Sequence, residues 1–234
     1  MVLVSFANQK GGSGKSTLTT AVATMLAVDY NYRVLVIDAD TQQSIAGKRK
    51  ALDTQLLNEG EEFPYPILGL APGKILDYLD SLEEGQYDVV LIDLPGRSDD
   101  VAGVEVIISC DLVIVPVVAS DFDQLSTGAF LDGMSAVIKE GNPDLKLRVL
   151  RMKVNPGQLE EEAAVEFLES YGIAQMPLFI QERAGYKRVS TLRPVTSRQY
   201  AREMNITPQV QQEVVKLTEA VVEILGLPSS TATE

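Results

Sequence analysis

The sequence contains no histidine and a single cysteine among its 234 residues. Without imidazole, general-base, metal-ligand and pH-switch roles fall to carboxylates, lysines or bound water, which excludes Ser-His and zinc-His chemistry. Cys110 cannot form an internal disulfide, in agreement with a reducing compartment. Because its neighbours are apolar, we expect Cys110 to be a buried small hydrophobe rather than a reactive thiol.

Long apolar runs are also absent from the sequence. Stretches such as Leu112 to Val118 are far shorter than the ~18 residues that a membrane span requires. The N-terminus enters an apolar strand pattern directly, without a charged segment or a cleavage site, so we expect no secretory signal. These features predict a cytoplasmic protein with no membrane partner.

The composition is that of an ordinary globular protein, with 45% hydrophobic and 23% charged residues. The length favours one domain, which we place at residues 1–227, followed by a flexible tail at 228–234. Short Val/Ile/Leu runs alternate with stretches of helical spacing, which predicts a three-layer α/β sandwich with a mostly parallel central sheet flanked by helices. The strands are expected at 2–7, 34–37, 89–92, 112–117 and 149–154, and the first and last helices at 16–28 and 207–225.

A glycine-rich segment, Lys10-Gly-Gly-Ser-Gly-Lys-Ser16, joins the first expected strand to the first expected helix. Glycines there allow successive backbone N–H groups to approach phosphate oxygens, as in a P-loop NTPase fold. Lys15 would then contact the β- and γ-phosphates and the Ser16 hydroxyl would bind Mg²⁺, so ATP and Mg²⁺ are the expected cofactors. The predicted nucleotide-binding residues of this segment are Gly11, Gly12, Ser13, Gly14, Lys15, Ser16 and Thr17.

The segment departs from the standard P-loop pattern, because Gln9 stands where that pattern begins with glycine and a second lysine, Lys10, follows it. With Asn8 before it and Thr17 after it, the segment resembles the deviant P-loop of the ParA/MinD family of ATPases. The strand expected at 112–117 also has its counterpart in that family, in the same order along the chain. The resemblance therefore covers about the first half of the chain, and the second half matches more loosely. Two further segments resemble the switches of the family, Val36-Ile-Asp-Ala-Asp-Thr-Gln-Gln-Ser44 and Val90-Leu-Ile-Asp-Leu-Pro-Gly96.

Carboxylates lie at the ends of two expected strands. Asp93 ends an apolar strand, where a P-loop ATPase carries a magnesium-binding carboxylate, so we expect it to hold Mg²⁺ through water. By resemblance, Asp40 positions the hydrolytic water and Asp38 supports the magnesium shell, which makes Ser16, Asp38 and Asp93 the expected metal ligands. A helix cap is the alternative role for either Asp38 or Asp40. Thr41 replaces a proline that is usual in the first switch and Gln43 a small residue, so the timing of the switch is expected to differ.

Lys10 is a second cation beside Lys15, which already serves the phosphates. The resemblance implies that Lys10 reaches the phosphates of a partner subunit, so that ATP joins two copies into a homodimer and hydrolysis releases them. The expected catalytic residues are therefore Lys10, Lys15, Asp38 and Asp40. Asn155 follows another expected strand, where related proteins place an adenine contact, and an ordinary turn residue is the alternative.

Two branches of the family disagree with this sequence. An iron–sulfur carrier needs several cysteines, and only Cys110 is present. A membrane-binding relative needs a basic amphipathic helix at the C-terminal end. The helix expected at 207–225 is amphipathic but acidic, which suits packing on the core better than contact with anionic lipid. Its charged residues are Glu213, Lys216, Glu219 and Glu223.

Basic residues gather between Gln181 and Arg202, although the chain has a net charge of −13. Six cations and the single acid Glu182 give a local balance of +5, the segregation expected of a DNA-binding face. Solvated surface charges or nucleotide contacts are the alternative. The segment Lys48-Arg49-Lys50 is a second, shorter basic candidate, and contact with a partner is its alternative role. The predicted DNA-binding residues are Arg183, Lys187, Arg188, Arg193, Arg198 and Arg202.

Together these features predict a short ParA-type ATPase for plasmid or chromosome segregation. By resemblance, its ATP-bound homodimer binds DNA without sequence specificity, and a ParB-like centromere-binding adaptor stimulates hydrolysis and release. The chain starts at the ATPase strand, so we expect no N-terminal helix-turn-helix domain and a cytoplasmic, nucleoid-associated protein. The alternatives are a dethiobiotin-synthetase-like ligase and a positioning ATPase for another large assembly.

Overall fold

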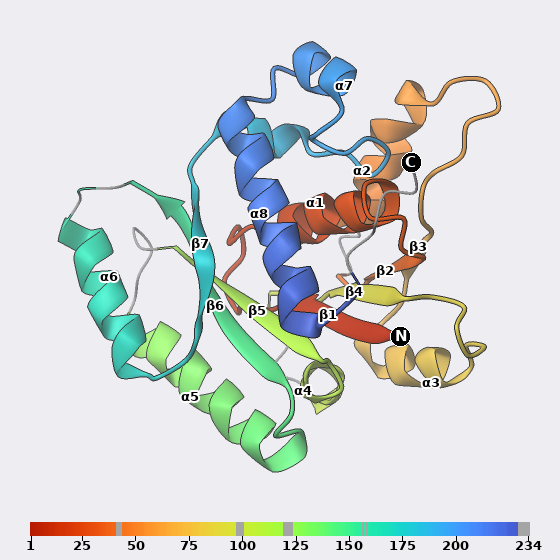
Figure 1. The fold of residues 1–234 in the computed structure, drawn as a ribbon. Helices are drawn as coiled ribbons and strands as arrows, with labels where there is room; N and C mark the ends of the chain where they lie inside the picture. The colour runs from red at the N-terminus through yellow and green to blue at the C-terminus, as the bar shows by residue number, and fades with distance from the viewer. Residues whose placement is uncertain (41–43, 97–100, 119–123, 156, 158, 229–234) are drawn as a thin grey trace.

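The chain forms one parallel β-sheet covered by helices on both faces (Figure 1). The computed structural model describes residues 1–40, 44–96, 101–118, 124–155, 157 and 159–228. Within them, seven strands pair in the order β3-β2-β4-β1-β5-β6-β7, and every neighbouring pair is parallel. Helices supply the crossover connections that parallel neighbours require. The predicted three-layer α/β sandwich is confirmed.

Five strands lie close to the predicted ranges, whereas the two strands at the edges of the sheet were not predicted. The first, β3, has only three residues, and the second, β7, contains a proline, so neither shows a clear apolar run. The strands are β1 (Val2–Phe6), β2 (Val34–Asp38), β3 (Ile67–Gly69), β4 (Val89–Asp93), β5 (Leu112–Val118), β6 (Lys146–Val154) and β7 (Gln175–Gln181).

The helices form the two outer layers of the sandwich. Alternate residues of β2 point to opposite faces: Val36 packs with Leu18 of α1 and Leu217 of α8, and Ile37 packs with Val106 of α4. The α-helices are α1 (Lys15–Val28), α2 (Ser44–Ala51), α3 (Ile75–Asp80), α4 (Val101–Ile108), α5 (Gln124–Gly141), α6 (Leu159–Ser170), α7 (Arg198–Glu203) and α8 (Pro208–Leu225). Short 3₁₀ helices are η1 (Asp53–Leu56), η2 (Pro72–Lys74) and η4 (Ala184–Arg188).

The last helix, α8, begins and ends where the sequence predicts. The Thr207 hydroxyl accepts a hydrogen bond from the backbone N–H of Val210 at 3.5 Å, Pro208 opens the first turn, and Gly226 ends the helix with φ 65°. Among the described helices, none is long and apolar enough to cross a membrane. The buried stripe that packs α8 on the core comprises Val210, Val214, Leu217 and Val221.

A buried polar brace joins α2 and η1 to the segment that follows η4. The Asp53 carboxylate, 2% exposed, accepts hydrogen bonds from the backbone N–H and the hydroxyl of Thr191, at 2.7 and 2.6 Å. Arg49 donates to the Thr191 hydroxyl at 3.0 Å and to the Tyr65 carbonyl at 2.7 Å. Its guanidinium carbon lies 4.3 Å from the ring centre of Phe63. The brace fixes the middle of the basic segment, at Thr191, against α2, the helix that follows β2.

The brace changes the interpretation of the short basic segment at 48–50. Lys48 donates to the carbonyl of Val189, and Arg49 is held between the aromatic rings and Thr191. Burial lowers the pKa of both side chains. Only Lys50 of the three is exposed. Lys48 and Arg49 therefore hold two parts of the fold together and do not form the short basic surface that the sequence suggested.

Replacing Asp53 with alanine is expected to destabilise the fold strongly. The change leaves the buried Thr191 N–H without its acceptor, at a cost of about 3 kcal/mol in the free energy of unfolding. For a chain of this length, the melting temperature should fall by roughly 6–12 °C, measured by calorimetry or circular dichroism. Asp80→Ala, at an exposed position of α3, serves as the control. Equal melting temperatures for the two variants would contradict the role assigned to the brace.

Candidate functional site

The candidate site lies at the carboxyl edge of the central strands. Asp93, the last residue of β4, pairs in register with Asp38, the last residue of β2, and with Phe6, the last residue of β1. The backbone N–H of Ala39 donates to the Asp93 carbonyl at 3.0 Å and extends this contact. The glycine-rich loop starts directly after β1. Parallel pairing therefore brings two carboxylates and the loop to one edge, where ligands of open α/β sheets bind.

The loop has the backbone conformation that its glycines permit. Gly12 and Gly14 have φ of 75° and 97°, in the left-handed region that side chains disfavour. A Cβ added to Gly14 would lie 3.0 Å from the Met152 methyl group. Gly14 also precedes α1, whose N-terminus carries no side-chain cap among the described residues. The first N–H groups of this helix therefore suit an anion such as a phosphate.

Lys15 lies inside the loop, with 8% of its surface exposed. Its ammonium group donates to the Lys10 carbonyl at 3.3 Å, and the Ser13 hydroxyl donates to the same carbonyl at 3.2 Å. Burial lowers the pKa of Lys15, while the nearby charges of Asp93 and Asp40 act in the opposite direction. Lys15 is thus a buried cation close to the strand-end carboxylates.

Asn8 holds the loop in place and was not predicted as a site residue. Its side-chain amide donates to the Pro116 carbonyl at 2.5 Å, and its carbonyl oxygen accepts from the Lys10 N–H at 2.8 Å. Asn8 thereby ties the loop to the end of β5. A polar residue between a buried strand and a glycine-rich loop is the signal that could have indicated this role.

Asp93 is a buried carboxylate, 1% exposed. Among the described residues, no donor has both the distance and the angle of a hydrogen bond to either of its oxygens. The pKa of Asp93 is raised to about 7, chiefly by burial, and the charges of Asp38 and Asp40 act in the same direction. The nearby Ser16 hydroxyl and the Lys15 ammonium lower it. A buried carboxylate with no hydrogen bond of good geometry to either oxygen fits a site for a cation.

Asp38 caps a helix, which is the alternative role that the sequence left open for it. One of its oxygens accepts from the backbone N–H groups of Ile45 and Ala46, both at 3.0 Å, and so caps α2. The other oxygen is buried and has no hydrogen-bond partner among the described residues. Burial raises the pKa of Asp38 despite the two N–H donors. The carboxylate therefore caps α2 with one oxygen, and its other oxygen takes no part in the cap.

These oxygens fit a magnesium ion. Three buried carboxylate oxygens, one on Asp38 and two on Asp93, lack donors near Ser16 and Lys15. Oxygen is the ligand that Mg²⁺ prefers, and the ion keeps several waters and phosphate oxygens around it. No group of three or more His, Cys, Asp or Glu side chains suited to a metal occurs in the described ranges. The nucleotide and water would complete the coordination.

Gly96, in the segment that resembles the second switch, packs directly against the loop. A Cβ on Gly96 would lie 3.2 Å from the Gln9 carbonyl oxygen and 3.6 Å from the Lys15 ammonium nitrogen. Of the other predicted residues, Thr17 and Asp40 are half-buried, Lys10, Gly11 and Gly12 are exposed, and Asn155 is exposed at the end of β6. Thr41 and Gln43 lie outside the described residues.

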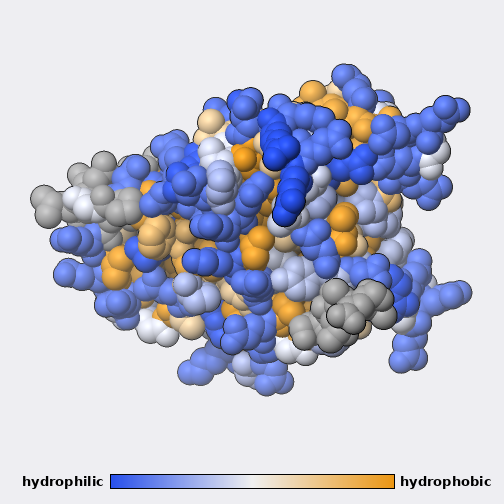
Figure 2. Space-filling model, turned by 45° about the horizontal axis from the view of Figure 1, so that its top comes forward, coloured by the Kyte–Doolittle hydropathy of each residue, from blue (hydrophilic) through white to orange (hydrophobic). Residues whose placement is uncertain are grey.

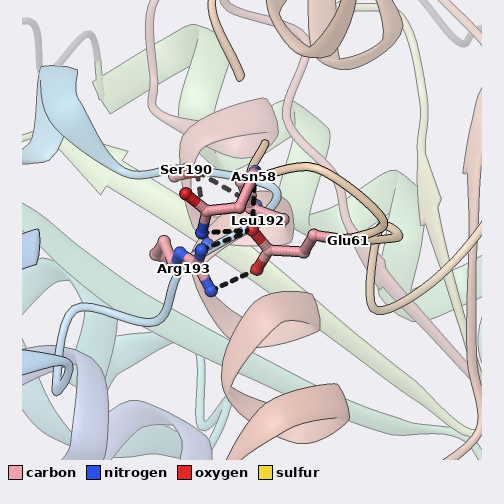
Figure 3. Close-up of polar contacts among 5 residues, drawn as sticks. All are labelled: Asn58, Glu61, Ser190, Leu192 and Arg193. Carbon is pink, nitrogen blue, oxygen red and sulfur yellow. Dashed lines mark hydrogen bonds and ion pairs between the residues drawn. The ribbon is translucent and has the colours of Figure 1, made fainter. Parts of the chain in front are cut away.

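The six predicted DNA-binding residues divide into two groups. Arg183 lies 3.3 Å from the Glu213 carboxylate, and Arg193 forms an ion pair with Glu61, which Figure 3 shows beside Ser190 and Leu192. Both arginines are half-buried. The Glu213 and Glu61 carboxylates beside them offset their charges. Figure 2 brings the top of Figure 1 forward and shows a largely hydrophilic face with scattered hydrophobic groups. The exposed cations of the segment are Lys187, Arg188, Arg198 and Arg202, which we name the basic face.

Replacing Asp93 with asparagine is expected to change how stability depends on pH. A carboxyl group whose pKa is about 7 in the folded state and ordinary, 3.8, in the unfolded state destabilises the fold as the pH rises between these values. In protein free of nucleotide and magnesium, the stability of Asp93→Asn relative to the original chain should therefore rise across this window, by at most about 1.4 kcal/mol per pH unit. Melting temperatures across the window measure the difference. A constant difference would contradict the raised pKa, and Asp77→Asn, exposed on α3, is the control.

Comparison with known proteins gives relatives along most of the chain. Residues 4–195 match the CobQ/CobB/MinD/ParA nucleotide binding domain. A maintenance of carboxysome distribution protein A from Halothiobacillus neapolitanus is 25% identical over 186 residues, covering 77% of this chain and 80% of its own length. A protein with the same name from Gloeobacter kilaueensis is 28% identical over 191 residues, covering 80% of each chain.

Solved structures show the same fold at lower identity. A plasmid partition protein from Borrelia burgdorferi superposes with a TM-score of 0.67 and 18% identity, covering 95% of this chain and 98% of that one. Cobyrinic acid a,c-diamide synthase from Mycobacterium smegmatis, with bound ADP and magnesium, gives a TM-score of 0.71 and 18% identity, covering 98% and 97%. Because the family match covers residues 4–195, from β1 to within the basic segment, this chain belongs to the CobQ/CobB/MinD/ParA family of nucleotide-binding domains.

Proposed function

We propose that this chain is an ATP-hydrolysing positioning ATPase whose ATP-bound homodimer binds DNA and moves a cargo through an adaptor protein. The observation that carries the proposal is the different placement of two lysines in one phosphate loop. Lys15 is buried within the loop and bonded to it, whereas Lys10 is exposed. A second cation on the outside of the loop supports a contact to the nucleotide of another copy, so that the γ-phosphate controls association.

The proposed chemistry uses the buried carboxylates at the strand ends. Ser16, Asp38 and Asp93 would hold Mg²⁺, which supplies charge neutralisation for the phosphates when bound. Lys15 would contact the phosphates, and Asp40 would orient the attacking water. Asn155, exposed at the end of β6, would contact the adenine. The unpartnered oxygens of Asp38 and Asp93 are the structural support for this division of roles.

The basic face is the proposed DNA contact. Its four cations are exposed, and Arg188 is oriented by hydrogen bonds to backbone carbonyls, one of them Asn205 at 3.2 Å. The brace through Asp53 fixes the segment that carries these cations. Exposed cations on an otherwise acidic chain support binding to phosphates without base recognition, and therefore a strong dependence on salt.

The double substitution of Arg198 and Arg202 with alanine is expected to weaken binding of the ATP-bound protein to random duplex DNA by about tenfold at about 0.1 M salt. The slope of log affinity against log salt should fall by about 2, because two phosphate contacts are lost. Fluorescence anisotropy of a labelled duplex measures both quantities. Lys74→Ala combined with Lys139→Ala removes two exposed lysines elsewhere and should change neither. An unchanged slope in the arginine variant would place the DNA contact on another surface.

The cargo divides the proposal into two versions. The two curated relatives carry the name of carboxysome distribution, which supports a large protein assembly as the cargo. A plasmid or chromosome with a ParB-like adaptor is the version closest to the sequence prediction, and a plasmid partition protein shares the fold. Deleting the gene and following both replicon loss and the spacing of large cytoplasmic assemblies by microscopy separates these versions.

A ligase for a small carboxylate is the competing function, because a diamide synthase has the same fold. The two functions differ in what stimulates ATP turnover. The proposed positioning ATPase should respond to random DNA together with its adaptor. Turnover that responds to a small carboxylate and an amine donor, and not to DNA, would favour the ligase.

A further inference from the structure

A groove of about 530 Å³ lies between β7 and the N-terminal half of α8, and none of the residues that line it belongs to the phosphate loop. Its wall on the β7 side is apolar and formed by consecutive residues from Met176 to Phe179. On the other side lie Lys216 and Glu213 of α8, with Arg151 of β6 at one end. Consecutive strand residues alternate between the two faces of a sheet. Because all four residues from Met176 to Phe179 line the groove, it runs along β7 rather than over one face of the sheet.

The strand that lines the groove is irregular. Val149 pairs with Gln175 and Arg151 pairs with Phe179, so a step of two residues on β6 faces a step of four on β7. The extra residues form a bulge at 176–178. On β6, Lys153 has φ 53°, a conformation that is uncommon for a residue other than glycine. Bulges and such backbone angles redirect side chains and gather at functional sites.

The strand also lies at the edge of the sheet. In the described part of the chain, β7 pairs with β6 alone and is the last strand in the order. Its outer backbone groups are therefore open to another extended segment, except at Pro177, which has no N–H. The groove and the open edge occupy the same stretch of chain.

The charges around the groove are predominantly positive. Arg183 is offset by Glu213 at 3.3 Å, and the Tyr186 hydroxyl donates to the same carboxylate at 2.7 Å. Arg151 stacks on Phe179, with its guanidinium carbon 5.2 Å from the ring centre, and Lys216 is exposed. Two cations thus remain beside an apolar wall, on a chain whose net charge is −13.

We propose that this groove binds an extended acidic segment of a partner protein, with carboxylates placed at Arg151 and Lys216 and apolar side chains on the Met176–Phe179 wall. A peptide fits better than a nucleic acid. The wall formed by Met176 to Phe179 is apolar, so it suits the apolar side chains of a peptide and offers no contact to a row of phosphates. Main-chain pairing along β7 would add affinity, and the two cations would select the acidic sequence.

Selection of random displayed peptides on the nucleotide-free protein tests this proposal, because none of the residues that line the groove belongs to the phosphate loop. The expected result is a class of peptides rich in Asp and Glu beside Leu or Phe. Binding of the strongest, measured by fluorescence anisotropy, should weaken at least about tenfold in Lys216→Glu. Arg151→Gln should weaken it in the same direction. Lys139→Glu, on the exposed surface of α5, should bind as the original chain does.

Three results would overturn the proposal: a selection without an acidic class, equal binding by Lys216→Glu, or displacement of the peptide by short single-stranded DNA. Melting temperatures of the variants confirm that they are folded, which is expected because Lys216 is exposed. A positive result would not depend on the DNA-positioning function, since no nucleotide, DNA or adaptor is present.

Discussion

Replacing Lys10 with alanine is expected to abolish ATP-dependent dimerisation while ATP binding is retained. The backbone of Lys10 is part of the loop: its N–H bonds Asn8, and its carbonyl accepts from Ser13 and Lys15. These contacts remain in the variant, because only the side chain is removed. The side chain is exposed and belongs to a loop that already holds one buried lysine. Its proposed role lies in the contact between two copies.

The expected size of this effect follows from removing a cation that faces phosphate across an interface. Such a loss weakens association by about 100-fold or more. Sedimentation velocity with a non-hydrolysable ATP analogue and Mg²⁺ measures the dimer, and calorimetric titration measures nucleotide affinity. Lys50→Ala, at an exposed lysine of α2, is the matched control. A dimer of unchanged stability in Lys10→Ala would remove the basis of the proposed switch.

Replacing Lys15 with methionine is expected to abolish nucleotide binding itself, which the Lys10→Ala variant retains. Methionine fills much of the buried space of the lysine stem and removes the charge. The affinity for ATP should fall by about 100-fold or more, because a charge-assisted contact to the phosphates is lost inside a buried site. Dimerisation should fail in consequence. The two lysine variants therefore separate binding of the nucleotide from its use.

The measurement for Lys15→Met is titration of ATP and ADP with the folded variant. Circular dichroism establishes that α1 and the sheet are intact, as expected for a substitution of similar volume. Affinity within a few-fold of the original chain would contradict the position assigned to the Lys15 ammonium in the loop.

The central part of the fold could be predicted because its signals are local. The strands β1, β2, β4, β5 and β6 are apolar runs, and α8 carries a proline at its first turn and a glycine after its last. The edge strands β3 and β7 lack such runs. Their place in the sheet depends on pairing with distant segments, which a single sequence does not reveal.

The candidate site shows the same division. The residue types in the loop and at the strand ends predict a nucleotide site, but the register of β2 against β4, which sets Asp38 beside Asp93, is a tertiary property. Arg183 looked like a surface cation until the fold brought Glu213 beside it. Lys48 and Arg49 were misread for the same reason, since each has a partner more than a hundred residues away.

The most direct test of the proposed switch is the affinity for random duplex DNA in different nucleotide states. Anisotropy should be measured with a non-hydrolysable ATP analogue and Mg²⁺, with ADP and Mg²⁺, and without nucleotide. The account predicts tight, salt-sensitive binding only with the ATP analogue, and its loss in Lys10→Ala. Equal DNA binding in all three states, or none in any, would contradict it.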